Sequence, residues 1–205
     1  MASYIISNKK DLNIFDDKAD TDMTVLTITA HIEVDLSVLR LYPQLKELNL
    51  YGKFTGYENI PMLEYLESLK ISGSMTTNRI SDLGFIENIS NLKKLWIESL
   101  PSVVTLPALH NIYALKMYEL HKIENLEILL GSRLRFLDLC LCADKVPASK
   151  IAEILSKIDT LEKVGVMIDR NGRKEEVLRN QLIKLGKKHL IDDDGILYAK
   201  NWDNL

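Results

Sequence analysis

Residues 92–97 have the sequence Leu92-Lys93-Lys94-Leu95-Trp96-Ile97, and the spacing of their apolar residues returns along most of the chain. Written as L-x-x-L-x-L, with Ile, Met or Val also accepted at the apolar positions, seven copies begin at residues 23, 45, 66, 92, 112, 134 and 161. The intervals between them are 22, 21, 26, 20, 22 and 27 residues. A period in the low twenties is typical of a solenoid, in which each repeat packs on its neighbours. We therefore expect one continuous array.

Each copy predicts a short β-strand whose alternate residues point to opposite faces. In the second copy, Leu48 and Leu50 would point to the core, and the outward residues are Glu47, Asn49 and Tyr51. A chain that returns to the same strand position in every repeat stacks its strands into a parallel sheet. Most of the return segments contain Pro or Gly and lack a strong helix pattern, so we expect turns and short 3₁₀ helices there.

Two longer repeats contain additional segments. The polar stretch 74–79 predicts an enlarged loop in one of them. In the other, Pro147 precedes apolar residues at helical spacing, which are Ile151, Ile154, Leu155 and Ile158. This pattern predicts a helix that begins near the proline. A second helix is expected from about residue 173 to residue 188.

The ends of the array are expected to be caps, because a solenoid otherwise exposes apolar surface at both ends. We assign residues 1–22 to an N-terminal cap, 23–169 to the array and 170–205 to a C-terminal cap, all in one continuous domain. The turn sequence 193–195 lies between the apolar stretches 190–191 and 196–198, which predicts a hairpin after the second helix. The N-terminal cap contains an acidic cluster that we interpret as solvated surface, with a metal or partner site as the alternative: Asp16, Asp17, Asp20 and Asp22.

The repeated motif resembles that of the leucine-rich repeat family, L-x-x-L-x-L-x-x-(N/C)-x-L, over about three quarters of the sequence. The ninth position departs from the family pattern, since it is Ser74, Leu100 or Leu120 in three repeats, and only Cys142 matches. The resemblance implies an α/β solenoid of short, irregular repeats. A curved parallel sheet would form its concave side, with turns, short 3₁₀ helices and a few helices on the convex side. It also implies that a partner protein binds on the concave face.

The outward positions of the strands are the candidate binding surface. Aromatic residues gather in the central repeats with lysines between them, a composition typical of interface hot spots. The alternative is that Trp96 and the tyrosines pack against long neighbouring side chains across the sheet. The candidate partner-binding residues are Asn49, Tyr51, Lys70, Lys94, Trp96, Glu98, Lys116, Tyr118, Phe136 and Asp138.

Catalytic and metal-binding patterns are weak. Strand alternation points Cys140 outward and the family pattern points Cys142 inward, so we interpret Cys142 as structural and expect no disulfide. The histidines have no metal-binding spacing, and the acidic residues 192–194 lack the alternation of a calcium loop, so we predict a turn there. We expect no enzyme activity, no cofactor and no metal. A cysteine-dependent enzyme with Cys140 as nucleophile remains a remote alternative.

Composition restricts the partner. The formal net charge is −3 and the pI is about 5.9, so a nucleic-acid partner is not favoured. The first residues do not have the pattern of a signal peptide, and no apolar run approaches a membrane span. We therefore expect a cytoplasmic protein without membrane contact.

The function predicted from these features is a non-enzymatic interaction with one protein partner. An immunity or inhibitor protein that masks a toxic enzyme is one form of this hypothesis, and a scaffold or adaptor without inhibitory action is the other. We expect a monomer when the chain is free; self-association through a sheet edge is the structural alternative.

Overall fold

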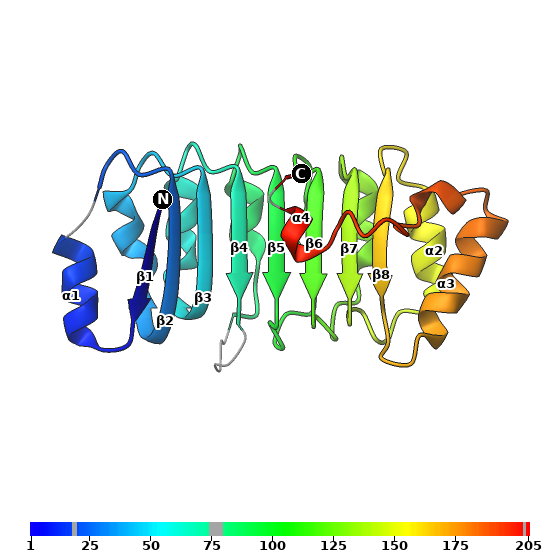
Figure 1. The fold of residues 1–205 in the computed structure, drawn as a ribbon, viewed down its shortest axis with the longest axis horizontal. Coiled ribbons are helices and arrows are strands. Elements are labelled where there is room, and N and C mark those ends of the chain that lie inside the picture. Colours follow the sequence, from blue (N-terminus) through cyan, green and yellow to red (C-terminus); the bar gives the residue numbers. More distant parts are fainter. Residues whose placement is uncertain (18–19, 74–79, 203) are drawn as a thin grey trace.

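The strands of the protein form a single parallel sheet (Figure 1). The computed structural model describes residues 1–17, 20–73, 80–202 and 204–205. Eight strands follow one another in sequence order across the sheet. They are β1 (Ala2–Ile6), β2 (Val25–Asp35), β3 (Glu47–Thr55), β4 (Ser68–Ser72), β5 (Lys94–Glu98), β6 (Ala114–Tyr118), β7 (Phe136–Cys140) and β8 (Lys163–Met167). The α/β class and the parallel, solenoid-like sheet predicted from the repeat are confirmed.

The register of the sheet follows the repeat. All seven copies of the motif form strands, β2 to β8, and equivalent residues pair directly: Leu48 with Leu69, Leu69 with Leu95, and so on to Val164. The register changes once, within β2 and β3 after Ala30. Strand β1 adds an eighth strand from within the predicted N-terminal cap. The inward apolar residues therefore stack in continuous columns, which are almost completely buried.

The segments that connect the strands are mainly turns and 3₁₀ helices, as predicted. The 3₁₀ helices are η1 (Leu36–Leu41), η2 (Tyr57–Met62), η3 (Gly84–Asn88) and η4 (Leu126–Gly131). Their apolar residues, such as Leu39, Ile60 and Ile86, are buried in the same core as the strand leucines. In Figure 1 these segments lie behind the sheet, so the opposite face of the strands is left to the outward side chains.

Helices cover both ends of the sheet (Figure 1). Helix α1 (Lys9–Asp17) lies beside β1, where Phe15 stacks on Tyr42 with ring centroids 5.5 Å apart. The sequence pattern did not predict this helix. At the other end lie α2 (Ala148–Ser156) and α3 (Arg173–Lys184), both of which were predicted. The predicted enlarged loop at 74–79 lies outside the described residues.

The predicted C-terminal hairpin is wrong. After η5 (Lys188–Leu190), Ile191 makes an isolated parallel bridge to Val164, and residues 196–198 form a turn and a bend. The Asp192 carboxylate accepts hydrogen bonds from the backbone N–H groups of Ile196 and Leu197 at 3.2 and 3.1 Å. This side chain satisfies the N–H groups that a second hairpin strand would have used. The chain then continues to a short helix, α4 (Ala199–Trp202), in front of β5 and β6 (Figure 1).

Three successive strands end in a residue with left-handed backbone conformation. Ser99, Glu119 and Leu141 follow β5, β6 and β7, and each has a φ of 53°. Their N–H groups extend the ladder by donating to Tyr118, Cys140 and Met167 carbonyls at 2.9, 2.9 and 2.7 Å. A non-glycine residue in this conformation costs about 1 kcal/mol. The additional hydrogen bond offsets that strain and fixes the direction in which the chain leaves each strand.

Gly52 is the position at which the close approach of two strands requires glycine. Its φ is 116°, and an added Cβ would lie 2.1 Å from the carbonyl oxygen of Ala30. We expect Gly52→Ala to lower the free energy of unfolding by about 2–4 kcal/mol. Chemical denaturation measures this change. Gly131→Ala is the matched control, because an added Cβ there meets no atom within 4 Å. Equal stability of the two variants would contradict the close approach.

Candidate functional site

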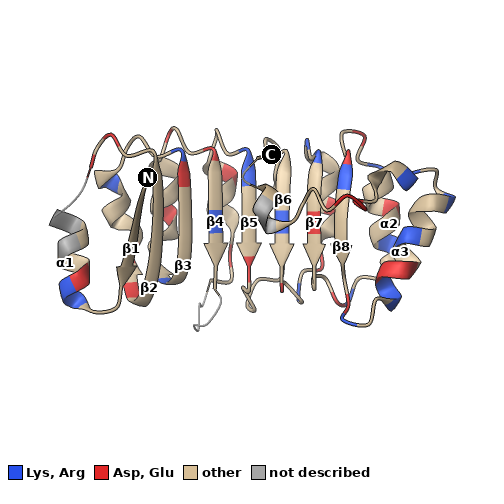
Figure 2. Cartoon of the chain, in the orientation of Figure 1, with Lys and Arg blue, Asp and Glu red and all other residues tan. Residues whose placement is uncertain are grey.

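The ten candidate residues lie on one face of the sheet, opposite the 3₁₀ helices. The register aligns Asn49, Lys70, Trp96, Lys116 and Asp138 in a row across β3 to β7. A neighbouring row contains Tyr51, Glu98 and Tyr118, whereas Lys94 and Phe136 begin their strands. Figure 2 shows basic and acidic residues across β3 to β8, so neither sign dominates this face. We call it the sheet face.

The part of the sheet face on β2 to β4 is polar. Asn49 donates from Nδ2 to Glu47 Oε1 at 2.7 Å and to Thr27 Oγ1 at 3.4 Å. The Lys70 ammonium lies 4.9 Å from the centre of the Tyr51 ring. All of these side chains are half-buried. The C-terminal residues do not cross these strands (Figure 1).

Trp96 lies at the centre of the sheet face and is enclosed by long side chains. The Lys70 Nζ lies 3.3 Å from the centre of a Trp96 ring, and the Lys116 Nζ lies 4.6 Å away. Trp202 of α4 packs edge-on against Trp96, with ring centroids 5.9 Å apart and an interplanar angle of 71°. Packing across the sheet, the alternative raised for Trp96, is therefore present. The Trp96 indole N–H is buried and meets no acceptor among the described residues.

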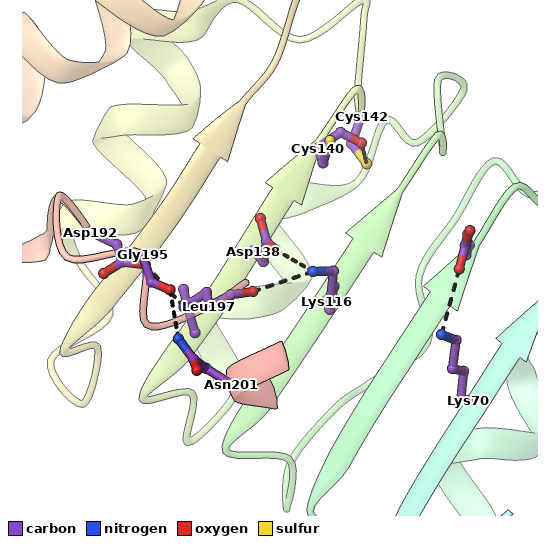
Figure 3. A network of polar contacts seen from close by, with 10 residues as sticks. Lys70, Lys116, Asp138, Cys140, Cys142, Asp192, Gly195, Leu197 and Asn201 are labelled. Carbon is purple, nitrogen blue, oxygen red and sulfur yellow. Dashed lines mark hydrogen bonds and ion pairs between the residues drawn. The ribbon is translucent and has the colours of Figure 1, made fainter. Parts of the chain in front are cut away.

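Lys116 and Asp138 form an ion pair beneath the C-terminal segment (Figure 3). The Lys116 Nζ lies 2.9 Å from Asp138 Oδ2 and also donates to the Leu197 carbonyl oxygen at 3.3 Å. Lys116 is only 8% exposed, which is unusual for an outward lysine on a sheet. Burial raises the pKa of Asp138, although the Lys116 charge and hydrogen bond act in the opposite direction. The pair is thus largely shielded from water and depends strongly on its internal partners.

The C-terminal segment, residues 192–205 of which the structure describes 192–202 and 204–205, covers the sheet face over β5 to β8. Leu197 and Trp202 are 2% and 4% exposed. Leu197 lies over Gly165 of β8: an added Cβ would be in van der Waals contact with Leu197 Cδ1 at 3.5 Å and would approach Asp138 Oδ1 more closely, at 3.1 Å. Tyr113 donates from its hydroxyl to the Leu205 carbonyl oxygen at 2.8 Å. The region predicted only as an end cap therefore also occupies much of the predicted binding surface.

The remaining candidate residues lie near this segment or at the strand ends. Tyr118 lines a cavity of about 400 Å³ between β6 to β8 and the C-terminal segment, together with Arg179 and Tyr198. Glu98 lies 3.9 Å from the Lys70 ammonium. The Arg135 guanidinium lies 5.3 Å from the centre of the Phe136 ring. The structure places these residues on the same face, but only some of them at the surface.

Cys140 points to the sheet face, as expected, but it is more buried than an outward residue of an open sheet. Its side chain lines the same cavity, yet the residue is only 7% exposed. Burial raises the pKa of the Cys140 thiol to about 11 and that of Cys142 to about 12. Cys142 is buried in the core, as expected, and its Sγ donates to the Cys140 carbonyl oxygen at 3.1 Å. Both residues therefore remain thiols near neutral pH, the less nucleophilic form.

Within the part of the chain that the structure describes, no group of three or more His, Cys, Asp or Glu residues could hold a metal ion. The predicted turn at 192–194 is confirmed, with Asp192 used to close it. The side chains of Asp16 and Asp17 lie outside the described residues, and Asp20 accepts a hydrogen bond from the Asp22 N–H at 3.0 Å. Among the described helices, none has the length and apolarity needed to cross a membrane.

No family model matches the sequence, and none of the curated proteins compared with it matches either.

Sequence reasoning missed the C-terminal segment as a component of the site. Two signals pointed to it: Gly165, the only residue without a side chain in the middle outward row, and Trp202, a large apolar residue in a polar terminal stretch. Either alone is ambiguous. Together they indicate that the sheet face lacks side-chain volume at Gly165 and that the Trp202 side chain could cover the adjacent part of this face.

The buried ion pair makes a prediction about stability. Lys116→Met leaves the Asp138 carboxylate without its counter-charge, so we expect the free energy of unfolding near pH 7 to fall by about 3 kcal/mol. Removal of the lysine also raises the pKa of Asp138 further. The folded variant then binds a proton that the unfolded chain releases, so its stability rises as the pH falls through that pKa. Denaturation at several pH values measures both effects.

The control for this prediction is the double variant Lys116→Met with Asp138→Leu, which removes both charges. It should recover part of the lost stability and show a weaker pH dependence. A Lys116→Met variant as stable as the wild type would show that the pair is solvated.

The contact between Trp96 and Trp202 has a spectroscopic signature. The chain contains only two tryptophans, and their rings lie close enough for their ultraviolet transitions to couple. We expect a paired positive and negative band in the far-ultraviolet circular dichroism spectrum that either Trp96→Phe or Trp202→Phe removes. The difference spectra of the two variants should be equal. Retention of the band in either variant would place the two rings apart in solution.

Proposed function

We propose that this chain is a non-enzymatic leucine-rich repeat solenoid that binds a protein partner on the sheet face, as its concave surface. The observation that carries the proposal is that a polypeptide segment of this chain already docks there. Leu197 lies over Gly165, Trp202 packs on Trp96, and a main-chain carbonyl accepts from Lys116. A face that holds one segment by apolar, aromatic and main-chain contacts is suited to hold another.

The repeat geometry supports the assignment to leucine-rich repeats. The first six motif positions place their apolar residues in stacked, buried columns, and the return segments are short. In three of the repeats the ninth position is filled by a buried residue, Leu100, Leu120 or Cys142. An apolar side chain at this position replaces the hydrogen bonds of the family's asparagine with packing. This difference is consistent with an irregular member of the family.

The charges of the sheet face support a protein partner over nucleic acid. Lys116 is paired with Asp138, and Lys70 lies near Glu98. These pairs neutralise two of the three lysines that a nucleic-acid hypothesis would need for phosphate contacts. Aromatic residues beside paired charges are instead typical of protein interfaces.

The cysteine environment supports a non-enzymatic role. A nucleophilic cysteine needs a neighbour that lowers its pKa, such as an imidazolium or a helix N-terminus. Burial raises the pKa of the Cys140 thiol, and the neighbouring Asp138 carboxylate raises it further. The proposal includes two modes of action, inhibition of a toxic enzyme and scaffolding. An inhibitor should form a stoichiometric complex and abolish the partner's activity, whereas a scaffold binds without inhibiting.

The proposal is tested with the polar part of the sheet face, which the C-terminal segment leaves uncovered. Once a partner has been captured with the intact chain, its dissociation constant is measured for Tyr51→Ala by calorimetry. We expect binding about tenfold weaker or more, because aromatic residues on the binding surface dominate affinity. Tyr65→Ala is the matched control, since Tyr65 is 49% exposed and lies outside the strands. Equal effects, or none from Tyr51→Ala, would move the site to the return segments or the caps.

A further inference from the structure

The C-terminal segment occupies the sheet face over β5 to β8, and its contacts indicate what kind of external segment could bind there. We propose that this surface is a groove for a protein segment that carries an apolar residue five positions before an aromatic residue. The C-terminal segment of the chain holds the groove closed and is displaced by such a partner. The inference rests on the proposed function, because it names the kind of partner and the competition it meets.

The C-terminal segment is folded largely by its own contacts. Asp192 accepts the N–H groups of Ile196 and Leu197, and Asn201 donates from Nδ2 to the Gly195 carbonyl oxygen at 3.1 Å (Figure 3). These bonds lie within the segment, so the spacing between Leu197 and Trp202 does not depend on contacts with the sheet alone. A segment that is already shaped loses little conformational entropy on docking. It therefore acts as a compact ligand attached to the array.

The docked segment is separable from the core. Leu197 and Trp202 are buried, but neither belongs to the main apolar core, which lies on the other side of the strands. The apolar contacts that attach the segment to β5 to β8 are those of Leu197 and Trp202 already described. Polar contacts add to them: Lys116 and Tyr113 donate to the Leu197 and Leu205 carbonyl oxygens, and the Asp192 N–H donates to the Val164 carbonyl oxygen at 3.0 Å. Ion pairs of Asp193 with Arg179 and of Asp194 with Lys163 lie at its start. Release of the segment therefore exposes the groove without removing any strand leucine from the core.

The segment leaves one buried group unsatisfied. The Trp96 indole N–H is out of water and has no acceptor among the described residues. An unpaired buried donor destabilises the closed arrangement. A partner with an acceptor next to its aromatic residue, such as an Asn, Gln or Glu side chain, would satisfy this N–H. Such a partner gains a hydrogen bond that the internal occupant lacks, which gives it the means to compete.

The recognition elements of the groove are thus three. The surface at Gly165 packs against a branched apolar side chain, Lys116 donates to the main-chain carbonyl of that same residue, and Trp96 packs against an aromatic side chain and offers its N–H to an acceptor. Asp138 keeps the Lys116 ammonium in place from the next strand, 2.9 Å away. Leu197 and Trp202 show the five-residue separation that matches this geometry.

The experiment removes the two anchor side chains, Leu197 and Trp202, from the full-length chain and then adds a synthetic peptide of residues 192–205. The vacated protein is the double variant Leu197→Ala with Trp202→Ala, whose core is unchanged. Calorimetry should show the peptide binding at least about tenfold more tightly to the vacated variant than to the wild-type chain, where the internal segment competes. Thermal unfolding and circular dichroism establish that the vacated variant is folded.

Three controls test the recognition elements. A peptide with both anchor residues changed to alanine should not bind. Adding Gly165→Val to the vacated variant should weaken binding of the wild-type peptide about tenfold or more, because the larger side chain would occupy the surface on which Leu197 packs and would approach Asp138 Oδ1. A third arm replaces Ala199 of the peptide by Trp and Trp202 by Ala, which keeps the composition and destroys the spacing; it should not bind.

The inference is overturned if the peptide binds the two proteins equally, binds neither, or tolerates the altered spacing. That result leaves the proposed function intact, because partner binding is measured separately through Tyr51. The opposite outcome is also distinguishable. If the peptide binds as expected but Tyr51→Ala does not change the affinity for the partner, the groove is supported and the proposed partner surface is contradicted.

Discussion

Parallel pairing in a constant register is the constraint on which the rest of this structure depends. From β3 to β8, five residues of each strand pair with the residues that occupy the same places in the next repeat. A shift by one residue would move each set of leucines to the opposite side of the sheet and expose it to water. Burial of the leucine columns therefore specifies the register. The turns, the 3₁₀ helices and the left-handed residues at the strand ends serve to return the chain to that register.

The same constraint decides the chemistry of the opposite face. Direct pairing places unlike side chains side by side: Lys70 beside Trp96, Trp96 beside Lys116, and Lys116 beside Asp138. The array alone would leave this row in contact with water. The C-terminal segment removes Lys116 and Asp138 from it, which raises the pKa of the carboxyl group and makes the two charges depend on one another. The row of side chains that the array alone would expose to water thus becomes part of an interface within the molecule that is partly shielded from water.

The sequence predicted those parts of the fold that depend on local spacing. The seven strands and the helices α2 and α3 follow from periods of two, of about 3.6 and of about 22 residues, and the ten candidate residues were correctly placed on one face. The hairpin was wrong because an Asp192 side chain, rather than a second strand, bonds the N–H groups that follow the turn. Docking of the C-terminal segment was missed because its contacts join Lys116 to Leu197 and Tyr113 to Leu205, 81 and 92 positions apart. No periodic pattern relates residues at such separations.

The attachment of the C-terminal segment to the array has a quantitative consequence. A ligand joined to its own site by a short connection is present there at an effective concentration on the order of millimolar, whatever the concentration of the protein. A weak external ligand at micromolar concentration therefore cannot replace it, however abundant the protein itself is. Only a ligand whose intrinsic affinity for the groove is considerably higher than that of the segment can displace it. The C-terminal segment would in this way raise the affinity that an external ligand needs. An apolar and aromatic surface that could bind many ligands weakly would then bind only those of high affinity.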